Sequence, residues 1–103
     1  MTADLFTMLE QRFHECDSNG IYLNKGGKFS LLGLICDIAV DEKVIDPPVP
    51  AHDPKIYPDV WCYDGEACVL SHKVGQWAGL KDTRGFGLIG VSLDDLRENW
   101  ESL

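Results

Sequence analysis

The chain has 103 residues, of which 45% are hydrophobic and 25% are charged. These values are close to the average of globular domains, so they exclude a disordered chain or a fibrous repeat, and we expect one domain over residues 1–103. Seventeen acidic and nine basic side chains give a net charge of −8. Nucleic acids and anionic membranes are bound mainly through Lys and Arg, so this balance argues against both and favours a basic protein partner.

The beginning of the chain does not resemble a secretory signal peptide. Its first ten residues contain no Lys or Arg and no long apolar run. The longest apolar run, residues 31–40, is interrupted by Asp37 and falls short of the ~20 residues that span a bilayer. We therefore expect a cytoplasmic location, with the four cysteines as reduced thiols.

The first predicted element is a helix over residues 3–16. Its apolar side chains, among them Leu5, Leu9 and Phe13, recur at helical spacing on one stripe. Asn and Gly within residues 17–20 favour the left-handed conformation that ends a helix.

A β-hairpin and a buried helix are predicted next. Residues 21–23 and 28–31 are β-prone and flank a turn at 24–27, where two glycines supply positive φ. From residue 32 to about 42 the chain is apolar on nearly every side, which predicts the central, buried helix.

All five prolines lie between residues 47 and 58. They predict a stiff loop over residues 44–58, without a helix or a central strand. A second hairpin is predicted from residues 60–63 and 67–70 around the turn at 64–66.

The C-terminal third begins with a short helix that Ser71 caps and Gly79 ends. Residues 81–90 look like a loop, and a last helix is expected near residues 93–101. The fold class predicted is α+β, with three to four short helices packed on one or two small antiparallel β-hairpins. The expected core consists of Leu5, Leu9, Phe13, Leu31, Leu34, Ile35, Ile38, Val69, Val74, Trp77, Leu80 and Leu96.

Residues 85–90 match the string G-x-G-x-x-G of dinucleotide-binding folds. That site needs a strand before the glycines, a helix after them and an acidic residue about 20 positions later. Thirteen residues follow Gly90, so we interpret the string as a glycine-rich surface loop.

Two cysteines are considered for metal binding or oxidation. Cys62, Cys68 and His72, with His52 or Asp53, have a loose likeness to zinc spacing but lack the tight cysteine pairs of structural zinc sites. On the second hairpin the two cysteines would lie opposite one another. We favour ordinary thiols, leave a labile disulfide and zinc open, and assign no metal ligand.

The usual signatures of enzymes are not found in the sequence. It has no nucleophile elbow, no phosphate loop and no calcium loop. The adjacent acidic pairs at 41–42 and 94–95 would diverge on a helix. We expect a non-enzymatic protein without a cofactor.

Three segments, in order, resemble small, mostly uncharacterised proteins encoded by tailed phages and prophages. Residues 29–37 (FSLLGLICD) are similar to a "C-x-L-G-x-L-C-D" pattern, residues 69–80 (VLSHKVGQWAGL) to "v-L-P-x-x-V-x-x-W-A-G-L", with Ser71 in place of proline, and residues 92–99 (SLDDLREN) to "s-L-x-x-L-N-D". The resemblance implies a shared fold, a viral origin and hence the cytoplasm of a bacterial host. Its shared positions are packing residues, so it implies no active site.

Three functions are considered on this basis. The first is a phage protein that binds and inhibits a host or anti-phage defence protein, by occupying a basic, nucleic-acid-binding surface. The second is a binder that sequesters a nucleotide immune signal, with phosphate bound by Lys81, Arg84, Gly85 and Gly87. The third is a structural or assembly role in the phage. A homo-oligomer is left open.

The proline loop and the second hairpin are the predicted partner-binding surface. Prolines order the loop in advance, so docking loses less conformational entropy. The alternative is a solvated loop that covers the edge of the core. The candidate residues, all acidic or tyrosine, are Asp46, Asp53, Tyr57, Asp59, Tyr63, Asp64 and Glu66.

Overall fold

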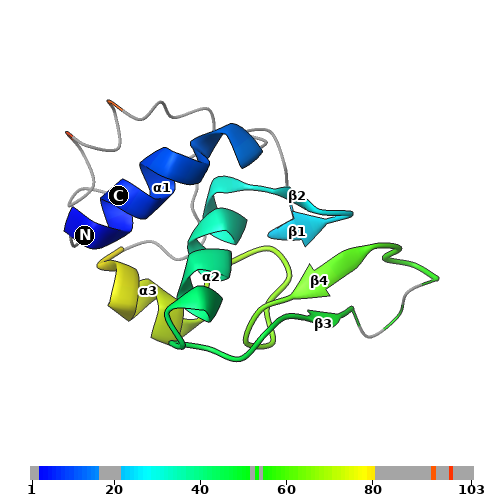
Figure 1. Cartoon of the computed structure of the whole chain (residues 1–103). Helices are drawn as coiled ribbons and strands as arrows, with labels where there is room; N and C mark the ends of the chain where they lie inside the picture. The colour runs from blue at the N-terminus through cyan, green and yellow to red at the C-terminus, as the bar shows by residue number, and fades with distance from the viewer. Residues whose placement is uncertain are drawn as a thin grey trace.

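The computed structural model describes residues 3–16, 22–51, 53, 55–80, 94 and 98. Within them the fold is α+β, with three helices and one four-stranded antiparallel sheet (Figure 1). The helices are α1 (Ala3–Arg12), which continues into a 3-10 turn at Phe13–Glu15, α2 (Leu31–Asp41) and α3 (His72–Ala78).

The strands are β1 (Asn24–Lys25), β2 (Lys28–Phe29), β3 (Val49–Pro50) and β4 (Val60–Cys62). They lie in the order β2-β1-β4-β3. Strand β4 pairs with β1 on one side and with β3 on the other, so the first hairpin belongs to one sheet with β4 and β3.

The first hairpin is confirmed, with its strands shifted along the chain. Gly26 and Gly27 form the turn with φ angles of 61° and 82°, which favour glycine. The paired strands are therefore β1 and β2, rather than residues 21–23 and 28–31.

The second hairpin is wrong as predicted. Beyond β4 only a single bridge joins Tyr63 to Glu66, around Asp64 and Gly65, which both have positive φ. Residues 67–70 form no strand, because both edges of β4 are already occupied by β1 and β3.

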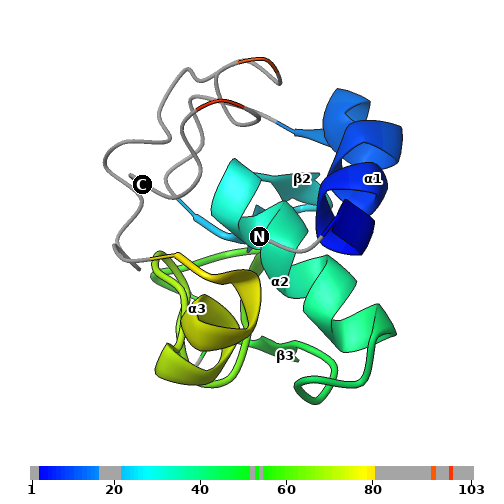
Figure 2. The same ribbon diagram turned by 90° about the vertical axis from the view of Figure 1, so that its left-hand side faces the viewer.

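Helix α2 is the centre of the core, as its all-round apolar pattern predicts. It packs against α1 and α3, which lie on either side of it in Figure 2. The members of the expected core that are buried are Leu5, Leu9, Leu31, Leu34, Ile35, Ile38, Val74 and Leu80. Phe13, Val69 and Trp77 are half-buried, and Leu96 lies outside the described residues.

The predicted cap and the predicted end of α3 are both confirmed. Ser71 caps α3 by accepting a hydrogen bond from the Val74 N–H at 3.3 Å, and Gly79 ends the helix with a φ of 75°. Ser30 caps α2 in the same way, with the Gly33 N–H 3.1 Å from its hydroxyl oxygen.

Gly33 is where α2 approaches the backbone next to β1. A Cβ atom at this position would lie 1.6 Å from the carbonyl oxygen of Leu23. A side chain of any size would therefore force the helix and the residues before β1 apart.

Three sequence predictions fall on parts of the chain that are not described. They are the helix stop at 17–20, the loop at 81–90 and most of the last helix at 93–101; of the last helix, Asp94 and Glu98 are described, as helical and exposed. In the described part of the chain, no helix has the length and hydropathy needed to cross a bilayer.

Candidate protein-binding surface

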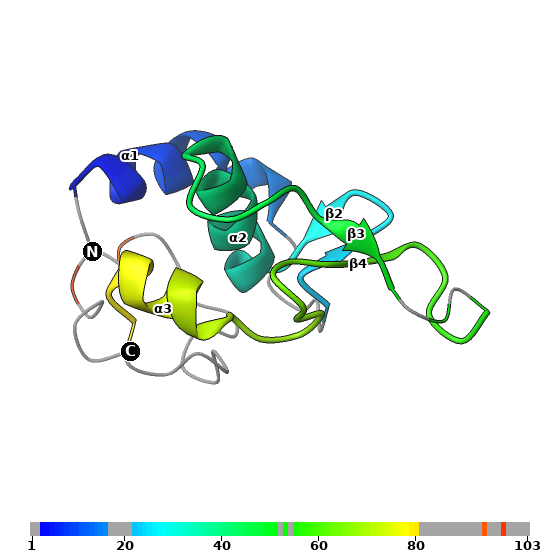
Figure 3. The same cartoon turned by 90° about the horizontal axis from the view of Figure 1, so that it is seen from below.

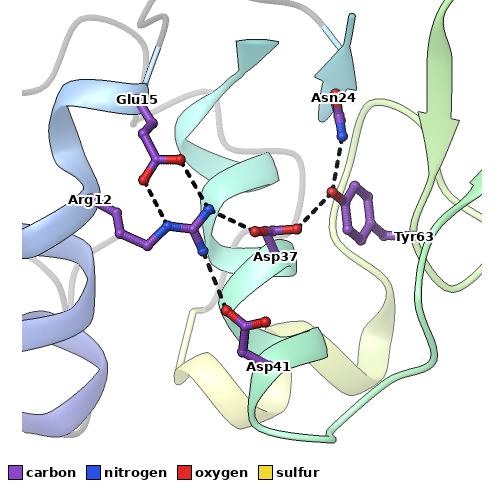
Figure 4. A network of polar contacts seen from close by, with 6 residues as sticks. All are labelled: Arg12, Glu15, Asn24, Asp37, Asp41 and Tyr63. Atoms are coloured by element: carbon purple, nitrogen blue, oxygen red, sulfur yellow. Dashed lines mark hydrogen bonds and ion pairs between the residues drawn. The ribbon is translucent and has the colours of Figure 1, made fainter. Parts of the chain in front are cut away.

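A polar network joins the end of α1 to α2 (Figure 4). The Arg12 guanidinium donates from Nε to Glu15 at 2.8 Å and from Nη2 to Asp37 at 2.7 Å. It also forms a longer ion pair with Asp41, at 3.6 Å. The hydrogen bond from Arg12 is the main reason why the pKa of Glu15 is lowered.

The network continues from α2 to the sheet. Asp37 accepts a hydrogen bond from the Tyr63 hydroxyl at 3.2 Å, and the Asn24 amide donates to the same hydroxyl at 3.2 Å. Asn24 in turn accepts from the Gly27 N–H in the β1–β2 turn. The network therefore connects α1, α2, β1 and the end of β4.

Tyr63 is not part of a partner surface, so that prediction is wrong. Its side chain has 0% exposure, and burial is the main cause of its raised pKa. The hydroxyl of the buried tyrosine keeps two hydrogen-bond partners, Asn24 and Asp37, so its burial leaves no polar group unpaired. A carboxylate within an apolar run was the available signal for such a partner.

Each group in this network binds another group of the same network. Among the described residues, no buried side-chain N or O atom lacks a hydrogen-bond partner, and no group of three His, Cys, Asp or Glu residues could hold a metal ion. We therefore assign the network a structural role, and the candidate functional site lies on the surface.

The loop between β3 and β4 projects away from the helices, as Figures 1 and 3 both show. Asp53 organises it: its carboxylate accepts from the Lys55 N–H, and its carbonyl accepts from the N–H groups of Ile56 and Tyr57. The Gly26 N–H donates to the Asp59 carbonyl at 2.8 Å, which fixes the loop to the β1–β2 turn. We call Asp53 and residues 55–59 the tip.

Exposed apolar side chains gather on β3 and the tip. In the described part of the chain, the large hydrophobic side chains that are exposed are Val49 at 58%, Ile56 at 66% and Tyr57 at 45%. The Tyr57 ring meets Tyr22 edge to face, with 6.4 Å between the ring centroids. Lys25 lies over the Tyr22 ring, 5.6 Å from its centroid.

The sequence-predicted residues divide between the two ends of the β3–β4 ladder. Asp53, Tyr57 and Asp59 lie at the tip, whereas Asp64 and Glu66 lie on the turn that follows β4. Val49 pairs with Cys62 in the antiparallel register, so Asp46, three residues before Val49, lies toward that turn. The distance from Asp59 to Asp64 is at most about 17 Å, given ~3.3 Å per extended residue.

We define the β3–β4 surface by the acidic side chains and the exposed large apolar side chains of this ladder and its two ends. The sequence analysis did not include Val49 and Ile56. A signal was available for Ile56, because an isoleucine in a proline-rich surface loop has no core in which it can be buried. The acidic members have exposed side chains, except Asp53, which is half-buried. The surface consists of Asp46, Val49, Asp53, Ile56, Tyr57, Asp59, Asp64 and Glu66.

Pro50 restricts what can bind along the outer side of β3, which is an edge strand. The Ala51 N–H donates to the Val60 carbonyl of β4, so the neighbouring nitrogen, that of Pro50, faces away from the sheet. Proline has no N–H to offer there, and this disfavours pairing with another strand. A partner must therefore be held mainly through side chains.

The four cysteines, all within the described residues, form no disulfide. The predicted position of Cys68 opposite Cys62 on a hairpin is wrong, because residues 67–70 form no strand. Burial raises the pKa of Cys36 to about 12, and partial burial raises that of Cys68. The alternative nucleotide site at Lys81, Arg84, Gly85 and Gly87 lies outside the described residues.

Comparisons with models of known protein families, with curated proteins and with solved structures found no significant match.

Proposed function

We propose that this chain is a non-enzymatic binding protein that docks on a positively charged surface of another protein and inhibits it. The observation that carries the proposal is the β3–β4 surface, where exposed apolar side chains on β3 and the tip share one ladder with exposed carboxylates. Residues 46–66 contain five acidic residues and one lysine, so their net charge is −4, half of the net charge of −8 of the whole chain.

Both components of this surface suit protein recognition. Exposed Ile and Tyr side chains release water when a partner covers them, at roughly 25 cal/mol per Å² of apolar area. Carboxylates around them attract a basic partner and disfavour an acidic one. The hydrogen bonds of Asp53 and Asp59 hold the loop in one conformation, so docking loses less entropy.

The resemblance to phage-encoded proteins supports a host or anti-phage defence protein as the partner. A partner that binds nucleic acid does so mainly through Lys and Arg side chains. An acidic protein that covers those side chains would block access of the nucleic acid.

The proposal is tested by the plating efficiency of phages on bacteria that carry defence systems and express the protein. The surface variant combines Asp46→Asn, Asp64→Asn and Ile56→Ser. Asn suits Asp64 because it tolerates positive φ, and the φ of Asp64 is 52°. The control combines Asp94→Asn and Glu98→Gln, which remove the same two charges at exposed positions elsewhere.

We expect the wild type and the control to restore plating against at least one defence system, and the surface variant to lose at least tenfold of that effect. Full rescue by the surface variant would contradict the proposal, as would a wild type that rescues plating against none of a broad panel. Capture of the purified target should also weaken when salt is raised to ~0.5 M, because screening shortens the range of charge attraction.

A further inference from the structure

We infer that the β3–β4 surface binds an extended, arginine-rich segment of its partner. This inference rests on the proposed function and names the chemistry of the partner. The aliphatic parts of the segment would pack on the apolar side chains of β3 and the tip, and its guanidinium groups would bind the carboxylates of the turn that follows β4.

The β3–β4 surface carries both apolar and acidic side chains, and this combination favours arginine as the ligand. Arg carries an aliphatic stem that packs on apolar surface and a head that prefers carboxylates and aromatic faces. Val49, Ile56 and Tyr57 are exposed next to acidic residues, which matches both halves of an arginine side chain. A purely apolar ligand would leave the carboxylates without partners.

The chain already holds cations on aromatic rings. Lys25 covers Tyr22 at 5.6 Å, and the Arg12 guanidinium lies 5.7 Å from the centroid of the Phe29 ring. Tyr57, next to Tyr22, is 45% exposed and is available to a cation from outside.

The charges are not evenly distributed along the surface, and this predicts how the segment lies. Lys25 and Lys55, both exposed, offset Asp53 and Asp59 at the tip. Asp64 and Glu66 are exposed on the turn, and Asp46 lies toward it. The guanidinium groups should therefore be bound mainly at the turn, whereas the tip contributes mainly apolar contact.

The geometry also limits the length and the mode of binding. The ends of the ladder are at most about 17 Å apart, which an extended segment of five or six residues spans. Pro50 disfavours addition of the segment as a fifth strand, so side chains rather than backbone hydrogen bonds should determine affinity.

The test uses fluorescence anisotropy with a fluorescein-labelled (Arg-Gly)₄ peptide and the full chain. The comparison peptide replaces each arginine by citrulline, which keeps the shape and removes the charge. One variant, Ile56→Ser with Tyr57→Ser, removes the apolar contact without changing charge. A second, Asp64→Asn with Glu66→Gln, removes charge at the turn, and Asp94→Asn with Glu98→Gln is its matched control.

We expect the arginine peptide to bind at least tenfold more tightly than the citrulline peptide. The apolar variant should lose five- to tenfold in affinity with an unchanged salt dependence, and the turn variant should lose affinity and salt dependence together. The matched control should change affinity by less than twofold. If circular dichroism shows that the double apolar variant is unfolded, Ile56→Ser alone replaces it. The Ile56 side chain is 66% exposed, so this single change should leave the fold intact.

Three results would overturn the inference. They are equal binding of both peptides, wild-type affinity in the apolar variant, or an equal loss in the turn variant and its matched control. Phage plating that is rescued by the wild type and lost in the surface variant, together with any of these results, would leave the proposed function standing and reject the arginine-rich segment.

Discussion

The close approach of α2 to Leu23 gives a sharp test of the fold through Gly33→Ala. The added Cβ would lie 1.6 Å from the Leu23 carbonyl oxygen, whereas carbon and oxygen normally stay at least about 3.3 Å apart. The backbone must therefore move by about 1.7 Å. The same Leu23 is held by two hydrogen bonds, from its N–H to Ala67 at 2.7 Å and from the Ser30 N–H to its carbonyl at 3.3 Å.

The magnitude follows from these contacts. Overpacking costs about 1–3 kcal/mol, and weakening the two hydrogen bonds adds about 1 kcal/mol each. Alanine is favoured over glycine in a helix by up to about 1 kcal/mol, which offsets part of the loss. We expect Gly33→Ala to lower the free energy of unfolding by about 2–4 kcal/mol, and Tm by about 10–30 °C.

Gly27→Ala is the matched control, because it adds the same methyl group where nothing lies within 4 Å. Its φ of 82° should cost about 1 kcal/mol for an L side chain. Urea unfolding followed by circular dichroism measures both variants. If Gly33→Ala proves as stable as Gly27→Ala, the helix does not approach the chain before β1 as described.

Three further predictions concern individual side chains. Tyr63→Phe removes a hydroxyl that joins two polar partners, so urea unfolding should show a loss of about 1–3 kcal/mol; an unchanged stability would mean that water replaces the hydroxyl. The pKa of Glu15 is lowered from 4.5 chiefly by its hydrogen bond with Arg12, so the pair stabilises the fold above that pH and loses its effect as the pH falls through the lowered pKa. Wild type and Glu15→Gln should therefore converge in stability as the pH falls below 4.5, and a constant difference would refute the pairing. Cys68 is exposed and Cys36 is buried with a pKa of about 12, so maleimide should label Cys68 in the native state and Cys36 only after unfolding, as mass spectrometry of the peptides would show.

The parts of the fold that depend on nearby residues could be predicted from the sequence. Ser71 and Gly79 mark the ends of α3 because a cap and a left-handed residue act within one turn of the helix. Gly26 and Gly27 mark the first turn for the same local reason. The apolar pattern after residue 31 predicts α2, since burial on every side leaves no polar stripe.

The pairing of the strands could not be predicted in this way. β4 joins β1 and β3, which are separated from each other along the sequence by the whole of α2, and β1 and β4 are too short to show a clear alternation. The second hairpin was predicted because its turn residues were correct, as the positive φ of Asp64 and Gly65 shows. A correct turn does not determine which strand occupies the other edge of β4.

The candidate site was predicted in part. Charge and proline content indicated the segment around residues 46–66, but exposure depends on the direction of each side chain relative to α2. Tyr63 turns inward, where its hydroxyl meets Asp37, and Ile56 turns outward, because the tip has no core to receive it. Neither direction is set by the local sequence.

The buried network and the β3–β4 surface are connected through Tyr63. This residue follows β4 directly, pairs with Glu66 and is hydrogen-bonded to Asp37 on the central helix. The turn that carries Asp64 is thereby fixed to the most buried of the described helices, although its own side chains are exposed. Carboxylates held in this way lose little entropy when a cation binds. A buried tyrosine thus explains how a short turn, without strand partners on its far side, presents its charges in a defined place.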